Sequence, residues 1–135
     1  MTCWRGQALT EAIKVCPPSF KPFEIMHETV RSVAKSGVND PSTRQVIDIS
    51  KGSASAMQAH MSRMIEVEES VAAAFAERLG SSSKDEFEPR LLANLTLSAM
   101  NVATLSWYRG DSQELLAAVE QVFSSFTRIV SDQRS

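Results

Sequence analysis

The feature that most constrains this chain is a run of eighteen residues, 91–108, without a single charged side chain. Its length is close to the ~20 residues that a helix needs to cross a bilayer. Neutral polar residues nevertheless recur at nearly every second or third position, and hydrocarbon disfavours them whereas a protein interior tolerates them. They are Asn94, Thr96, Ser98, Asn101, Thr104 and Ser106. The run therefore predicts a helix that other protein covers on more than one side, and not a membrane span.

Apolar residues at helical spacing also fill the first part of the chain. A short helix is expected over residues 2–15, where a pair of prolines ends it, and an amphipathic one over residues 22–35. Asp40 followed by Pro41 has the pattern of an N-cap and first helical position, so a third short helix is expected there.

The second part of the chain predicts three longer helices. Residues 53–79 form the longest periodic segment, and a fifth helix is expected to begin near residues 85–89 and to end at 109. A sixth is expected to begin with Asp111 as its N-cap and Glu114 as the capping-box partner. The predicted fold class is therefore all-α, an antiparallel bundle of about six helices in a single domain spanning residues 1–135.

The last two helices carry more apolar surface than one small chain can cover. One face of the uncharged helix can pack on the core of the same chain. The opposite face, with Ala93, Ala99 and Ala103, would stay exposed to solvent unless another subunit covered it. A second copy of the chain that covers this face is the economical solution. The alternative is that the other five helices wrap the uncharged helix completely.

Composition and motifs exclude several classes of function. The formal net charge is −2, from 14 basic and 16 acidic residues that are interspersed, so no basic stripe for nucleic acid is present. Cys3 and Cys16 are too few for a disulfide framework and match no metal-ligand spacing, so no metal is expected. Without a secretory signal, a cytoplasmic location is expected. Neither a phosphate loop nor a nucleophile elbow occurs, so we expect no enzyme activity and no cofactor.

Several segments resemble one known family. Residues 65–80 read IEVEESVAAAFAERLG and are similar to a helix common in tetracycline-repressor (TetR) type regulators. A short polar loop then leads into PRLLA at residues 89–93, followed by Trp107 near the end of a helix, a Gly-Asp pair and a final apolar helix. The order and spacing agree over about residues 53–132.

The resemblance implies a C-terminal regulatory domain whose last two helices form a dimeric four-helix bundle, while the earlier helices surround a pocket for a small, apolar effector. The expected interface residues are Leu92, Ala99, Ala103, Leu115, Val119, Val122, Phe126 and Ile129. Family members also carry a helix-turn-helix head, for which residues 2–15 are too short. DNA contact is therefore expected only through such a head, and the chain is either a fragment of a longer regulator or a natural truncation.

Polar or soft side chains on inward faces are the candidate effector contacts: His27, Met57, His60, Met61, Met64, Glu68, Asn94 and Asn101. A methionine stripe suits a varied set of ligands, but it is also ordinary core. Glu68 could hydrogen-bond a ligand or pair with Arg63 or another surface cation. Asn94 and Asn101 lie seven residues apart on one face, so they could line a cavity or hydrogen-bond across the dimer.

The sequence thus predicts the effector-binding and dimerisation domain of a TetR-type transcriptional regulator, expected to be a repressor. The alternative is a helical adaptor that binds partner protein and takes no small ligand. The two differ in whether a guest molecule is bound, and a third class, a small helical enzyme, has no motif in its favour.

Overall fold

The computed structural model describes residues 4–36, 52, 54–80, 85–112 and 114–132, and all regular secondary structure within these ranges is helical. The prediction of an all-α fold is confirmed. The helix expected after Pro41 lies outside the described residues. The helices are α1 (Trp4–Val15), α2 (Pro22–Ser36), α4 (Ala54–Leu79), α5 (Phe87–Tyr108) and α6 (Leu115–Asp132).

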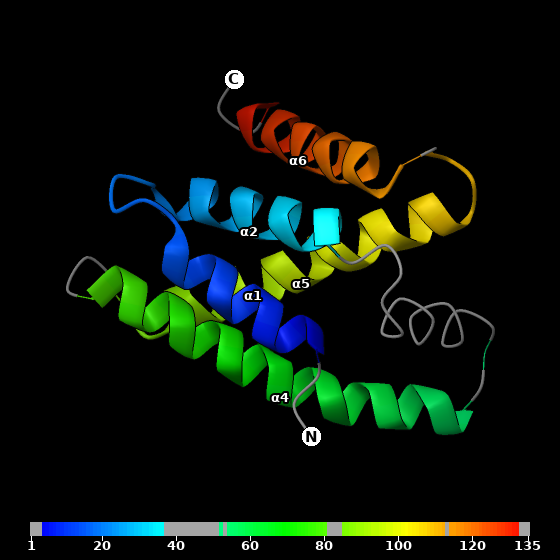
Figure 1. The fold of residues 1–135 in the computed structure, drawn as a ribbon, viewed down its shortest axis with the longest axis horizontal. Helices are drawn as coiled ribbons and strands as arrows, with labels where there is room; N and C mark the ends of the chain where they lie inside the picture. The colour runs from blue at the N-terminus through cyan, green and yellow to red at the C-terminus, as the bar shows by residue number, and fades with distance from the viewer. Residues whose placement is uncertain (1–3, 37–51, 53, 81–84, 113, 133–135) are drawn as a thin grey trace.

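The helices α4 and α6 lie on opposite sides of the molecule, with α1, α2 and α5 between them (Figure 1). The helix α5, which contains the uncharged run 91–108, contacts α2, α4 and α6, while α1 packs on α2 and α4. The core forms where these helices meet, and its largest fully buried side chains include Phe75, Leu9, Ile13, Ile25, Met100 and Leu115. The uncharged run is thus largely enclosed by the chain itself.

Two buried hydroxyl groups of α5 explain why polar residues are tolerated in this helix. Thr96 Oγ1 donates to the carbonyl oxygen of Leu92 at 2.7 Å, and Thr104 Oγ1 donates to that of Met100 at 2.8 Å. Each hydroxyl is satisfied by the preceding turn of its own helix, so neither needs a partner from another element. None of the helices in the described part of the chain has the length and apolarity that a bilayer crossing requires.

The pair α1 and α4 is joined by a close approach and by an arginine. A Cβ atom added to Gly6 would lie 3.3 Å from Cγ2 of Val67, so glycine permits the two helices to pack tightly here. At the other end of α1, Arg78 donates from Nη1 to the carbonyl oxygen of Ile13 at 3.3 Å and from Nη2 to that of Pro17. A cation at the carboxyl end of α1 also complements the helix dipole.

The connection between α5 and α6 corrects one sequence prediction. Gly110 has φ +85° and its N–H donates to the Trp107 carbonyl at 3.1 Å, while the N–H of Asp111 donates to the Ser106 carbonyl at 3.0 Å. This pair of bonds is a Schellman motif, so Asp111 completes the end of α5. The prediction that Asp111 is the N-cap of the next helix is wrong, because α6 begins at Leu115.

Candidate functional site

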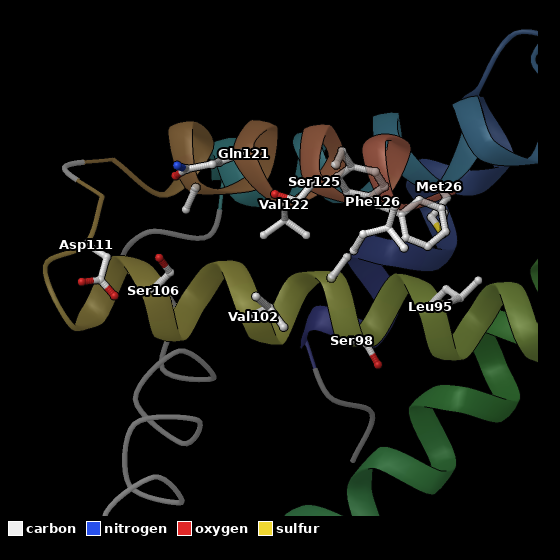
Figure 2. A pocket seen from close by; sticks show the side chains of 14 residues that line it. Met26, Leu95, Ser98, Val102, Ser106, Asp111, Gln121, Val122, Ser125 and Phe126 are labelled. Atoms are coloured by element: carbon white, nitrogen blue, oxygen red, sulfur yellow. The ribbon is translucent and has the colours of Figure 1, made fainter. Parts of the chain in front are cut away.

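A groove of about 510 Å³ runs between α5 and α6 (Figure 2). It is lined mainly by apolar and small polar side chains: Met26, Leu95, Ser98, Ala99, Val102, Ser106, Asp111, Ala118, Gln121, Val122, Phe123, Ser125, Phe126 and Ile129. The groove therefore belongs to the last two helices, with one contribution from α2.

Helical spacing brings these side chains to the groove. On α5, Leu95, Ser98, Val102 and Ser106 recur every three or four residues, which places them on one face. On α6, the corresponding row is Ala118, Val122, Ser125 and Ile129. The exposed fraction of Val102 is 55% and that of Ile129 is 61%, which is high for large apolar residues on the walls of one groove.

The two ends of the groove differ in character. At one end, Phe126 stacks on Phe23 of α2 with ring centroids 5.4 Å apart, and Phe23 meets Phe123 edge-on at 5.8 Å. At the other end, beside the turn from α5 to α6, Asp111 and Ser106 line the groove (Figure 2). The groove is thus aromatic at one end and acidic at the other.

A charged cluster fastens α2 to the side of α6. Arg31 Nε donates to Glu120 Oε1 at 2.7 Å, and His27 Nε2 lies 3.1 Å from Glu120 Oε2. Arg31 Nη1 also donates to Glu28 Oε2 at 3.0 Å. The hydrogen bond from Arg31 lowers the pKa of Glu120 below its usual value, and the same bond raises the pKa of Arg31. Arg31 thus pairs with both carboxylates of this partly exposed cluster, an arrangement that suits fixing α6 to α2 rather than transferring protons.

Comparison with protein families identifies the domain. The family model described as the MftR C-terminal domain, one of the TetR type, matches residues 21–131, which is most of the chain. This chain belongs to the TetR-type C-terminal domains. No curated protein and no solved structure gives a match. Membership makes it the regulatory domain of a transcriptional regulator, a class of domain that is in general non-enzymatic.

Of the eight residues predicted for the dimer interface of this TetR-type domain, four line the groove and four do not. Ala99, Val122, Phe126 and Ile129 line the groove. Leu92 is half-buried against the core, and Ala103, Leu115 and Val119 are fully buried inside the chain. The structure thus places these last three in the subunit's own core, where their side chains offer no surface to a partner.

The residues predicted for the effector pocket are not gathered in one cavity of the described residues. Met57 and Met61 are exposed on the N-terminal part of α4, while Met64 packs against the core. Glu68 Oε1 lies 3.8 Å from Arg90 Nε, a weak surface ion pair of the kind expected as the alternative. The remaining members are His27 in the charged cluster, the exposed Asn94, the half-buried Asn101 and His60, whose side chain lies outside the description.

The structure places Asn94, one of the predicted ligand contacts, at an exposed position of α5. Its Nδ2 donates to the Arg90 carbonyl at 2.9 Å, so the amide is satisfied one turn back on its own helix. The sequence reasoning missed groove residues such as Met26, Ser98, Gln121 and Ser125. On α6 the groove-lining residues Ala118, Val122, Ser125 and Ile129 follow a helical 4-3-4 spacing that can be read in the sequence. This row lies next to the apolar stripe that starts at Leu115, so it could have been predicted as the α6 side of the groove. Met26 has no such signal, because its contact depends on how α2 packs.

Proposed function

We propose that this TetR-type domain joins two copies of a cytoplasmic transcriptional repressor through α5 and α6, and that a small apolar effector changes how the two copies sit. The observation that carries the proposal is the open groove between α5 and α6. Dimerisation and effector binding are typical of TetR C-terminal domains, and the groove supplies a physical reason for dimerisation in this chain.

The groove supports dimerisation because its apolar walls gain from being covered. Burial of apolar surface contributes roughly 25 cal/mol per Å², and Val102 and Ile129 are the large exposed side chains here. With 22 residues in α5 and 18 in α6, the shared face is about 27 Å long and about 20 Å wide. Its projected area of about 540 Å² is about two-thirds of the roughly 800 Å² per partner of a standard interface.

The effector site is proposed against the N-terminal part of α4, which extends to one side of the bundle (Figure 1). Met57 and Met61 present exposed thioethers there, and Met64 continues the row toward the core. Thioether side chains adapt to apolar guests of varied shape. Such a guest would favour one packing of the helices over another, which is how a ligand shifts a two-state equilibrium.

The helix α2 could transmit a conformational change from the rest of the bundle to the groove. Its Met26 lines the groove, and its Phe23 stacks on Phe126, which also lines it. The helix α4 contacts α1 and α5, and both of these contact α2. A movement passed from α4 through them to α2 would therefore move side chains at the aromatic end of the groove. In a regulator, altered placement of two subunits changes the spacing of their DNA-reading helices, which must fit grooves about 34 Å apart.

Two measurements on the purified chain test the proposal. Light scattering after gel filtration is expected to give about twice the chain mass of 14.8 kDa, and a clean monomer at micromolar concentration would contradict dimerisation. Native mass spectrometry of protein taken directly from cells is expected to show a small-molecule adduct, which Met61→Glu removes. A dimer that never carries an adduct would favour the adaptor function.

A further inference from the structure

One carboxylate stands out in the mainly apolar groove between α5 and α6. Asp111 lies at the end of the groove where α5 turns toward α6 (Figure 2), and it is exposed in the single copy. A second copy laid over the groove would remove water from this carboxylate. A charge that loses water without gaining an opposite charge strongly opposes association, so the covering surface needs a cation at this position.

The best-placed cation is at the opposite end of the same groove. Arg128 is the one basic residue in α6, and its Nη2 donates to Ser125 Oγ at 3.2 Å. Ser125 lines the groove, so the Arg128 guanidinium lies at the rim. Arg31 is bound to Glu120, and Arg90 is turned toward Glu68 on α4. Arg109 is exposed at the C-cap of α5, at the same end of the groove as Asp111, so it is not the cation that a two-fold axis brings over from the opposite end.

Two-fold symmetry brings these two ends together. In a dimer of identical subunits the same patch is used on both copies, related by a two-fold axis. An axis perpendicular to the groove near Val122, which lies mid-way along it, places the Ile129 end of one copy over the Asp111 end of the other. Arg128 is six residues beyond Val122, about 9 Å along the helix, and a long side chain extends that reach.

We infer that in this dimer Asp111 of each copy forms an ion pair with Arg128 of the partner subunit, so that the contact occurs twice. The inference rests on the proposed dimerisation through α5 and α6. The apolar walls favour any apolar cover, whereas the two charges at opposite ends select a second copy in one direction. The pair therefore determines the register and the partner specificity of the interface.

Charge reversal gives a direct test by sedimentation equilibrium of the 135-residue chain. Asp111→Arg sets two pairs of like charges against each other in its homodimer, and so does Arg128→Asp. Each variant alone is expected to dimerise at least ~10-fold more weakly than the wild type, because like charges across an interface oppose association. The doubly substituted chain, D111R with R128D, is expected to return to within ~3-fold of the wild type.

Mixing the two single variants provides a sharper readout. A heterodimer of Asp111→Arg with Arg128→Asp restores an opposite-charge pair at both ends, so an equimolar mixture is expected to dimerise better than either variant alone. A merely local effect of either substitution would not produce this recovery. Arg90→Asp, which removes a cation outside the groove, serves as the matched control and is expected to dimerise like the wild type.

The outcomes distinguish a failure of the Asp111–Arg128 ion pair from a failure of dimerisation itself. A monomeric wild type would overturn the proposed dimerisation and the pair with it. A dimeric wild type whose reversal variants dimerise equally well would overturn the pair alone. Weakened single variants that recover neither in the double substitution nor in the mixture would also overturn it, since the residues would then act separately.

Discussion

The imidazole of His27 lies flat against the ring of Phe123, with centroids 4.4 Å apart and planes inclined by 14°. His27 belongs to α2, and Phe123 also lines the groove between α5 and α6. The same imidazole contacts Glu120 Oε2, to which Arg31 Nη2 also donates at 3.2 Å. One face of α6 thus receives α2 through an aromatic stack and a charged cluster, while the neighbouring face forms the groove wall.

The charged cluster predicts a pH-dependent contribution to stability. Glu120→Gln is expected to lower the free energy of unfolding by about 1 kcal/mol at pH 7, since the paired groups are half-exposed. The Glu120 pKa is lowered in the folded chain, so the unfolded state binds more protons. The contribution is therefore present above the ordinary carboxyl pKa and disappears as the pH falls through the folded value.

Urea unfolding of the wild type and of Glu120→Gln at a series of pH values measures this effect. The gap between the two free energies is expected to close on acidification, and Glu77→Gln, at an exposed position of α4, is the control. A gap that is the same at acid and neutral pH would show that Glu120 contributes by packing and not by charge.

Arg78 predicts a larger loss, because its guanidinium donates to carbonyl groups at the end of α1. Arg78→Ala removes charged hydrogen bonds to the part-buried Ile13 carbonyl and to the exposed Pro17 carbonyl, and is expected to destabilise the fold by about 2 kcal/mol. Arg78→Lys is expected to recover less than half, since an ammonium group cannot span the separate acceptors. Urea unfolding is the measurement, with Arg90→Ala, whose side chain is 72% exposed, as control. Equal stability of the two alanine variants would refute the role.

Gly110 predicts a loss of conformational origin at the end of α5. Its φ of +85° is costly for a side chain with a Cβ, so Gly110→Ala is expected to destabilise the fold by about 1 kcal/mol. Gly110→Asn is expected to cost less, because asparagine adopts left-handed conformations more readily. Thermal unfolding of the two variants compares them. Equal unfolding temperatures for the alanine and asparagine variants would show that the left-handed conformation of residue 110 does not limit the stability of the fold.

The helices were predictable because their apolar spacing and end signals are local properties. Which apolar row of a helix packs into the core, and which stays at the surface, was not predictable from the sequence. α6 carries two neighbouring rows, one with Leu115 and Val119 and the other with Val122 and Ile129. Spacing alone assigns both to one stripe, whereas the structure buries the first row in the core and leaves the second at the groove. Only the packing of α2 and α5 decides between the rows.

The candidate site was less predictable for the same reason. Asn94 and His27 looked like ligand contacts because they lie near apolar positions, yet one bonds to its own helix and the other to Glu120. The start of α6 was misplaced because Asp111 followed by Glu114 matches a capping box. The N–H of Asp111 instead closes the preceding helix, an arrangement that Gly110 makes possible.

The measurement that most directly tests the account is sedimentation equilibrium of Val122→Glu beside Ser124→Glu. Val122 lines the groove, whereas Ser124 is exposed on α6 outside it, so the two variants carry the same charge on different faces of one helix. We expect the wild type and Ser124→Glu to be dimers and Val122→Glu to be a folded monomer with an unchanged far-ultraviolet circular dichroism spectrum. A Val122→Glu chain that dimerises as tightly as the wild type would contradict this expectation.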